Sequence, residues 1–229
     1  MNIPSLYFPE SRTKTLRDAS GHPVEAPSLQ VHSTNNLKRL LQILLGIPKP
    51  HILDLGRLSG ANIEWFIQRG FKVHVDDRIS SLKPAPKPAS KPPPVSSVPL
   101  KKSEKKSPPL PPFEPLEYGP SFFHAVLCWD LFDYIVINQA QDVIADTARI
   151  LKPKGLLLAF FNFDRSSSAP PTRYRIIKED QLEYQPISSD LMPRQIYENR
   201  EIKELFSKFD TLNSCFLKNQ MRELLVQRR

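Results

Sequence analysis

The sequence predicts an α/β fold with a doubly wound, mostly parallel sheet, and three observations lead to this prediction. Residues 51–78 contain an apolar strand, a glycine turn, a helix and a second apolar strand in direct succession. Residues 145–161 contain a helix, a Pro-Lys-Gly turn and another apolar strand. Residues 211–226 contain two short apolar stretches that suit an antiparallel hairpin. Strands and helices that alternate in this way are typical of a sheet covered by helices on both faces.

The first strand and the turn after it determine most of the functional prediction. Residues 52–55 suit a buried parallel strand, and Gly56 and Gly60 allow a tight turn that brings backbone N–H groups near a ligand. Residues 61–69 contain neither Pro nor Gly, and we expect a helix there that ends at Gly70 in a left-handed conformation. This order is typical of a nucleotide-binding unit.

The second strand ends in two carboxylates. Residues 71–75 suit that strand, and Asp76 and Asp77 follow it about 20 residues after the glycine turn. A carboxylate at this place can accept hydrogen bonds from both ribose hydroxyls of a nucleotide.

The glycine turn resembles a known motif. Residues 54–60, Asp-Leu-Gly-Arg-Leu-Ser-Gly, are similar to the D/E-x-G-x-G-x-G sequence that ends the first strand of class I S-adenosylmethionine-dependent methyltransferases, which have a Rossmann-like fold. The resemblance implies that Asp54 and the two glycines surround the amino-acid end of the cofactor S-adenosylmethionine, and that Asp76 binds its ribose. Leu58 stands in place of the family's middle glycine, so it puts a side chain where the family lets the cofactor approach closely.

Two later segments resemble the same family. Residues 124–130, HAVLCWD, are similar to its fourth strand, after which residues commonly flank the cofactor. Residues 145–161 are similar to its next helix, turn and fifth strand, with Lys154 in place of the first glycine of the usual turn. Because Pro153 cannot continue a helix and Gly155 permits positive φ, we expect the chain to reverse there into an apolar strand.

The resemblance assigns one group of residues to the cofactor site: Asp54, Gly56, Ser59, Gly60, Asp76, Asp77, Cys128, Trp129 and Asp130. Methyl transfer from a sulfonium needs mainly proximity and orientation, so a catalytic base is optional. Asp130 is the candidate base, and it equally suits the cap of a helix that starts at Leu131. Trp129 suits stacking on adenine or an acceptor, or simply covers the end of the sheet. The five histidines and two cysteines have no metal-site spacing.

Residues 84–112 interrupt this pattern. They contain 11 of the chain's 24 prolines and six lysines, but neither glycine nor an aromatic residue. Such a segment cannot bury a core, so we predict a disordered, solvated insertion within a single domain that spans residues 29–229. The segment also suits a Pro-rich ligand for a protein partner or a basic tether for nucleic acid. Residues 1–28, with four prolines, are expected to form an extended arm.

The insertion shortens the region where the family has its third strand. Too few other residues remain between Asp77 and Phe123 for the usual helices and strand. We therefore expect a sheet that is abridged around this third strand, with a short strand near residues 113–118 and no clear acid to contact adenine.

Local patterns predict the other elements. Ser33 or Thr34 is expected to cap a helix whose leucines fall at helical spacing. The further expected elements are a two-stranded flap around 172–182, a helix from Asn199 or Arg200, and a terminal antiparallel hairpin of strands 211–217 and 222–226. In the family the segment after the fifth strand builds the acceptor pocket, for which the candidates here are Tyr174, Arg175, Tyr184 and Tyr197. Aromatic residues at such spacing also suit the core.

Composition and charge limit the class of protein. The chain has 229 residues, 40% of them hydrophobic, which suits one α/β domain. No run is apolar enough for a membrane span, and the first residues do not resemble a secretory signal, so we expect a cytoplasmic protein with reduced Cys128 and Cys215. The formal charge is +8, but residues 84–112 carry +5 of it and leave only +3 for the rest. Nucleic-acid binding is therefore not expected.

These observations predict methyl transfer from S-adenosylmethionine to an unidentified acceptor. The alternative is a non-catalytic methyltransferase-like interaction protein that has lost cofactor binding and uses its Pro-rich insertion. Another nucleotide-dependent enzyme, such as a dehydrogenase, agrees less well with the glycine spacing.

Overall fold

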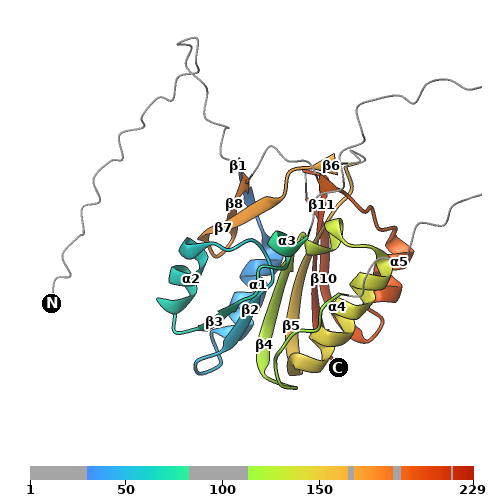
Figure 1. Cartoon of the computed structure of the whole chain (residues 1–229). Helices are drawn as coiled ribbons and strands as arrows, with labels where there is room; N and C mark the ends of the chain where they lie inside the picture. Colours follow the sequence, from blue (N-terminus) through green and yellow to red (C-terminus); the bar gives the residue numbers. More distant parts are fainter. Residues whose placement is uncertain (1–29, 83–112, 165–167, 188–191, 218) are drawn as a thin grey trace, which may run out of the picture. The chain divides into compact units, whose positions relative to one another are not determined.

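A six-stranded sheet is the central element of this chain (Figure 1). The computed structural model describes residues 30–82, 113–164, 168–187, 192–217 and 219–229. The strands of the sheet are β2 (His51–Asp54), β3 (Lys72–Val75), β4 (Phe123–Trp129), β5 (Leu151–Asn162), β10 (Phe209–Phe216) and β11 (Met221–Arg228). Their order is β10-β11-β5-β4-β2-β3. The neighbours among β3, β2, β4 and β5 pair in parallel, whereas β11 is antiparallel to both β5 and β10. The predicted fold class and its terminal hairpin are confirmed.

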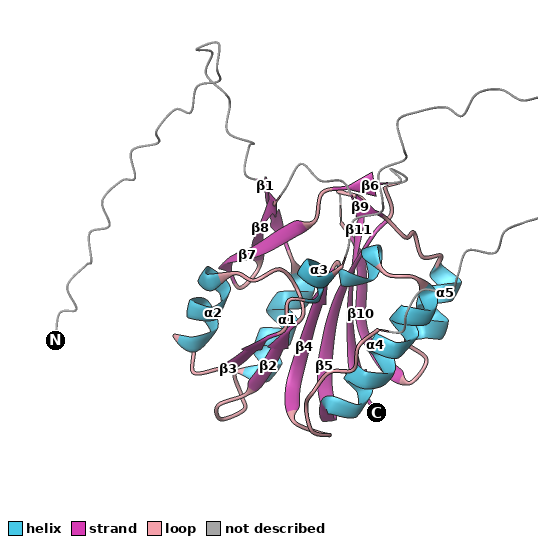
Figure 2. Cartoon of the chain, in the orientation of Figure 1, coloured by secondary structure: helices cyan, strands magenta, loops and turns pink. Residues whose placement is uncertain are grey.

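Helices cover both faces of the sheet (Figure 2). They are α1 (Asn35–Leu44), α2 (Gly60–Ile67), α3 (Arg78–Ser81), the 3-10 helix η1 (Leu131–Tyr134), α4 (Ile137–Ile150) and α5 (Asn199–Leu205). One apolar core lies between the sheet and α1 and α2, and a second lies between the opposite face and α3, α4 and α5. Within the described part of the chain, no helix is both long and apolar enough to cross a membrane.

The predicted helices on the first face form as their sequences indicate. The Thr34 hydroxyl caps α1 by accepting a hydrogen bond from the Leu37 N–H at 3.3 Å. The leucines at helical spacing are buried, except for Leu45, which is half exposed. Gly70, after α2, has φ of +81°, the left-handed conformation that its position predicts.

A smaller sheet covers α2 and part of the central sheet. It contains β1 (Gln30–Ser33), β7 (Thr172–Lys178) and β8 (Gln181–Pro186) in the order β1-β8-β7. A further short pair joins β6 (Ser168–Ala169) to β9 (Met192–Pro193). The predicted flap is therefore confirmed, but it has a third strand, β1, that the sequence pattern did not reveal.

The short strand expected near residues 113–118 is wrong. This segment has no strand pairing, because side chains of α4 satisfy its backbone instead. The Phe113 N–H donates to the Asp142 carboxylate, and the Arg149 guanidinium donates to the carbonyl oxygen of Leu116 at 2.8 Å. Among the residues that the structure describes, no strand pairs with the free edge of β3, which agrees with the predicted abridgement.

The turn before β5 differs in detail from the prediction. Lys154, not Gly155, takes the positive φ, at +63°. Gly155 is needed for another reason, because a Cβ there would lie 2.8 Å from the carbonyl oxygen of Lys152. The strand also starts earlier than expected, at Leu151, directly after α4. The predicted arm over 1–28 and the predicted insertion over 84–112 lie outside the described residues, so both stay predictions.

Candidate functional site

The glycine turn and the second-strand carboxylates lie together at the carboxyl ends of β2 and β3. The Asp76 N–H donates to the carbonyl oxygen of Asp54 at 2.9 Å. The Leu58 N–H donates to the Asp77 carboxylate at 3.1 Å. Because the chain leaves β2 for β3 on one side and the sheet continues with β4 on the other, this is the place where open α/β sheets bind ligands.

The glycine turn is ordered by its own side chains. The Gly56 N–H donates to Asp54 Oδ1 at 2.9 Å, and the Ser59 hydroxyl caps α2 by accepting from the Asn62 N–H at 3.4 Å. Leu58 is 52% exposed, so its side chain points into solvent and does not fill the space over Gly56. Gly60 has no heavy atom within 4 Å of an ideal Cβ, so the turn does not need a glycine there for space.

The indole of Trp129, the last residue of β4, lies directly on Gly56. A Cβ on Gly56 would be 2.2 Å from Trp129 Cδ1, so only glycine fits under the ring. Trp129 Nε1–H donates to Asp54 Oδ1 at 2.7 Å, and the residue is only 2% exposed. Its φ of +47° is unusual for a bulky residue and costs about 1–3 kcal/mol. The contacts of the indole must offset this strain.

The flap holds the indole from the other side. The Tyr174 ring, on β7, is parallel to Trp129 at a centroid distance of 5.2 Å, and Phe160 meets the indole edge-on at 5.6 Å. Asn62 ties the flap to α2, because its amide donates to the Tyr174 carbonyl at 2.7 Å and accepts from the Ile176 N–H at 2.8 Å. The glycine turn, the indole and the flap therefore form one packed unit.

Asp76 and Asp77 have protein partners as well. Asp76 forms an ion pair with Arg78 at 2.7 Å and remains partly exposed, with 27% of its side chain accessible. Asp77 caps α3 by accepting from the Ser80 N–H at 2.8 Å, and it also accepts from the Ser80 hydroxyl. A ribose at this place would share Asp76 with Arg78.

Burial dominates the electrostatics of the site. Desolvation raises the pKa of Asp54 to about 6, although hydrogen bonds from Gly56 and Trp129 oppose this effect. Desolvation also raises the pKa of Asp130 to about 6, although the nearby Arg194 charge and the hydrogen bond from Tyr134 oppose this effect. Asp130 Oδ1 is buried and has no hydrogen-bond partner within the described part of the chain. Asp130 occupies the N-cap position of η1, as the cap interpretation predicts, but its side chain makes no capping hydrogen bond.

A second buried acid lies next to Asp130. The Asn162 N–H donates a bifurcated hydrogen bond to the two carboxylate oxygens of Asp133, at 3.1 and 3.2 Å. Burial, together with the charge of Asp130, raises the pKa of Asp133 well above its usual range. The Tyr134 hydroxyl donates to Asp130 at 3.3 Å. Sequence reasoning missed Asp133 and Tyr134. The available signal was two acids three residues apart, directly after an apolar strand.

Other predicted residues are not brought to Gly56. Cys128 is fully buried in the core on the opposite face of the sheet, as is Tyr197, whose hydroxyl donates to the Ile135 carbonyl at 2.6 Å. Arg175 pairs with Glu183 at 3.0 Å. Of the acceptor-pocket candidates, only Tyr174 and Tyr184 belong to the core on the Trp129 side, as contacting rings. Both cysteines carry free thiols.

Two cavities that the structure describes lie elsewhere. One, of about 580 Å³, lies between α5 and the hairpin of β10 and β11, and the other, of about 450 Å³, lies between residues 113–115 and α4. Within the described ranges, no three His, Cys, Asp or Glu side chains gather as they would around a metal ion.

Sequence reasoning also missed Arg78 and Asn62, for which the sequence gives no signal beyond their closeness to the motif.

No protein-family model and no curated protein matches this chain. One solved structure with a similar fold is 1,6-didemethyltoxoflavin-N1-methyltransferase from Burkholderia thailandensis, with bound 1,6-didemethyltoxoflavin and S-adenosylhomocysteine. Its sequence identity to this chain is 17% and the TM-score is 0.45; the match covers 85% of this chain and 77% of that one. Another is a SAM-dependent methyltransferase from Methanosarcina mazei, at 12% identity and a TM-score of 0.44, covering 79% and 93%. A third, from Aquifex aeolicus, is also a SAM-dependent methyltransferase, at 11% identity and a TM-score of 0.44, covering 84% and 89%.

The strand order and the terminal antiparallel hairpin make the sheet doubly wound and mostly parallel, as the sequence predicts.

Proposed function

We propose that this chain binds S-adenosylmethionine at the carboxyl ends of β2 and β3 and transfers its methyl group to an acceptor. The observation that carries the proposal is the convergence of Asp54, the Gly56 turn and Asp76 at this edge of the sheet. The bound cofactor would supply an electrophilic methyl group on a sulfonium. The protein would supply position and orientation.

The partly exposed carboxylate of Asp76 supports binding of an adenosyl group through its ribose. Asp76 is accessible enough to accept hydrogen bonds from ribose hydroxyls, with Arg78 holding it in place. Asp54 would keep the turn in shape through its bond to the Gly56 N–H. Cofactor approach to Gly56 itself requires the Trp129 indole to leave its present position. Binding would therefore be coupled to movement of Trp129 and of the Tyr174 ring stacked on it.

Asp130 is the group best suited to accept a proton from the acceptor. Its Oδ1 has no partner within the described part of the chain, and its pKa of about 6 leaves it mostly ionised near neutral pH. We also infer a cytoplasmic setting, in which the free Cys128 and Cys215 thiols stay reduced. The acceptor is unidentified, and a protein partner for the Pro-rich insertion stays a prediction.

One observation favours a second function. The indole lies on Gly56, its N–H donates to Asp54, and Tyr174 covers it. If this arrangement is permanent, the chain is a non-catalytic member of the fold that acts through interactions with other proteins.

Calorimetric titration with S-adenosylhomocysteine separates the two functions. We expect saturable binding that Asp76→Asn weakens by at least about tenfold, because hydrogen bonds to a charged acceptor are lost. The matched control is Glu204→Gln, an exposed acid on α5 whose loss leaves the site untouched. NAD should not bind. Absence of S-adenosylhomocysteine binding at millimolar concentration contradicts methyl transfer and supports the non-catalytic function.

A further inference from the structure

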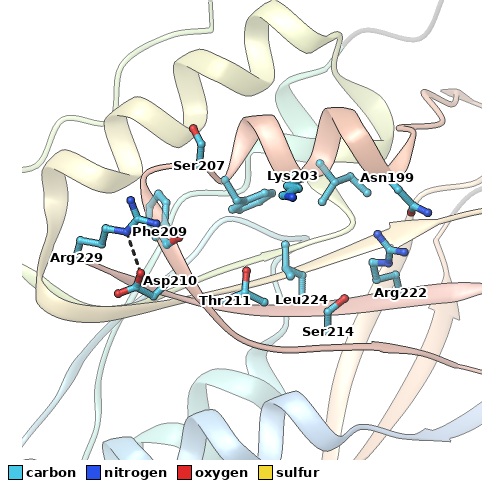
Figure 3. Close-up of a pocket in the computed structure, with 12 residues that line it drawn as sticks. Asn199, Lys203, Ser207, Phe209, Asp210, Thr211, Ser214, Arg222, Leu224 and Arg229 are labelled. Carbon is cyan, nitrogen blue, oxygen red and sulfur yellow. Dashed lines mark hydrogen bonds and ion pairs between the residues drawn. The ribbon is translucent and has the colours of Figure 1, made fainter.

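Arg222 lines the cavity of about 580 Å³ between α5 and the hairpin of β10 and β11 (Figure 3). Only 9% of this residue is exposed. Within the described part of the chain, its guanidinium has no ion pair and no hydrogen bond to a protein group, and its Nε is buried without an acceptor. A guanidinium that lines a cavity with its donors unused by the protein is suited to bind an anion there.

The contacts that Arg222 does make leave its donors free. Its guanidinium carbon lies 4.2 Å from the centroid of the Phe216 ring and 5.1 Å from that of Phe163. Rings over the face of a guanidinium stabilise its charge but use none of its N–H groups. The N–H edge therefore remains available for a planar, two-point contact with an oxyanion.

The remaining walls of the cavity suit an anion with an apolar part. Lys203 on α5 adds a second positive charge, while Asp210, the acid that lines the cavity, is paired with Arg229 at 2.8 Å. Figure 3 shows this pair at one end of the cavity and Arg222 beside Asn199 at the other. Apolar side chains also line the cavity: Ile202, Phe206, Phe209 and Leu224.

We propose that this cavity is a binding site for a small organic oxyanion, a carboxylate or a phosphate monoester, whose charged group contacts Arg222 and whose apolar body lies against Phe206 and Leu224. None of the residues predicted to bind the cofactor lines this cavity. The site is therefore independent of the proposed methyl transfer, and either can fail without the other.

The test is calorimetric titration of the full chain with benzoate, phenyl phosphate and inorganic phosphate. We expect saturable binding of at least one of the two aromatic anions, weakened by about tenfold or more in Arg222→Met. Arg222→Lys keeps the charge but loses the fork of donors, and it should also bind more weakly than the wild type. The matched control, Arg200→Gln, removes an exposed arginine of α5 that does not line the cavity, and it should bind like the wild type. Stronger binding of benzoate or of phenyl phosphate identifies the class of oxyanion.

Three results would overturn the proposal. The first is no saturable binding of either aromatic anion up to about 10 mM, where even weak sites fill. The second is undiminished binding by a folded Arg222→Met variant. The third is inorganic phosphate binding as tightly as phenyl phosphate, which would show that the apolar walls play no part. If Arg222→Met does not fold, Lys203→Met replaces it, because this exposed side chain leaves the core intact and should weaken binding by about threefold.

Discussion

Trp129 combines an unfavourable backbone conformation with a hydrogen bond and a ring contact of its side chain. Its φ of +47° is unfavourable, yet its indole donates to Asp54 at 2.7 Å and stacks on Tyr174. Strain of this kind persists only where the surroundings determine it, and it is commonest where a ligand or a switch acts. From the sequence, Trp129 suits either stacking on adenine or an acceptor, or covering the end of the sheet. In the structure its indole lies on the glycine turn at that end of the sheet.

Trp129→Phe isolates the hydrogen bond from the stacking. The phenyl ring keeps the contact with Tyr174 but leaves the buried Asp54 carboxylate without its indole donor, so we expect a loss of about 1–3 kcal/mol in the free energy of unfolding. The matched control is Trp65→Phe, because Trp65 contacts Arg69 near the surface of α2. Urea denaturation measures both variants, and equal losses would show that the bond to Asp54 contributes nothing of its own.

The burial of Asp130 should make the free energy of unfolding depend on pH. Burial raises its pKa from an ordinary value of 3.8 to about 6. Below pH 3.8 the Asp130 carboxyl is neutral in both the folded and the unfolded protein, so it does not lower the free energy of unfolding. Between pH 3.8 and about 6 it ionises in the unfolded protein but stays protonated in the folded one, so the free energy of unfolding falls as pH rises. By pH 8 this amounts to about 3 kcal/mol.

Asp130→Asn should therefore raise the free energy of unfolding at pH 8 and change it much less at pH 4. Urea denaturation at the two pH values measures this, with Glu204→Gln as the exposed control. Asp54 titrates over the same range in both proteins, so the comparison with wild type removes its effect. An equal change at both pH values would mean that the Asp130 carboxylate is not destabilised by burial.

At the scale of elements, a side chain joins α2 to the flap. Asn62 is 2% exposed and binds the backbone of β7 in the way a neighbouring strand would, with one bond donated and one accepted. This contact fixes the flap, and with it Tyr174, over the glycine turn. Flap opening therefore requires these two hydrogen bonds to break.

Asn62→Ala should loosen the flap. It leaves the Tyr174 carbonyl and the Ile176 N–H unpaired in a buried place, which costs about 2–4 kcal/mol for the two groups. Amide hydrogen exchange over residues 172–178 should become faster than in the wild type. The control is Gln68→Ala at the C-cap of the same helix, because the Gln68 amide donates to the exposed Glu64. Unchanged exchange in the Asn62 variant would show that the flap is held by its apolar contacts alone.

Local sequence patterns predicted the helices and strands that have a strong hydrophobic period. They did not predict segments whose structure depends on residues far away in the sequence. The leucines of α1 and the apolar strands were visible in sequence, because a core face has a fixed period. The strand β1 was not visible, since it pairs with β8 about 150 residues later. Residues 113–118 were misjudged because α4, through Asp142 and Arg149, satisfies their backbone.

The same division holds for the candidate site. The meeting of Asp54 with Asp76 was predicted, because the carboxyl ends of adjacent parallel strands must share one edge of the sheet. The position of Trp129 was not predicted, since its backbone conformation and its partner Tyr174 come from the assembled fold. The unpartnered Arg222 was likewise invisible, because its burial depends on the placement of α5 and the terminal hairpin.

At the scale of the whole molecule, the two chain segments that flank residues 83–112 are tied together. Arg78 donates to the carbonyl oxygen of Glu114 at 3.0 Å, and Leu82 and Phe113 both pack against the same apolar core. A short connection can therefore replace the sequence between them without moving either side.

Replacing residues 84–112 by a short Gly-Ser linker should leave the melting temperature within about 2 °C of the wild-type value, because loop length affects stability only weakly. Calorimetry measures this, and binding of S-adenosylhomocysteine should also be unchanged. A large fall in melting temperature would mean that this segment is a structural element rather than an insertion.

The most direct test of the cofactor site follows the two indole N–H resonances of the chain by NMR during titration with S-adenosylhomocysteine. The chain has two tryptophans, so Trp129→Phe assigns both signals. Because the Trp129 indole lies on Gly56 and bonds Asp54, its resonance should shift to saturation while that of Trp65 stays in place. If both resonances keep their positions at millimolar ligand, the carboxyl ends of β2 and β3 are not a cofactor site.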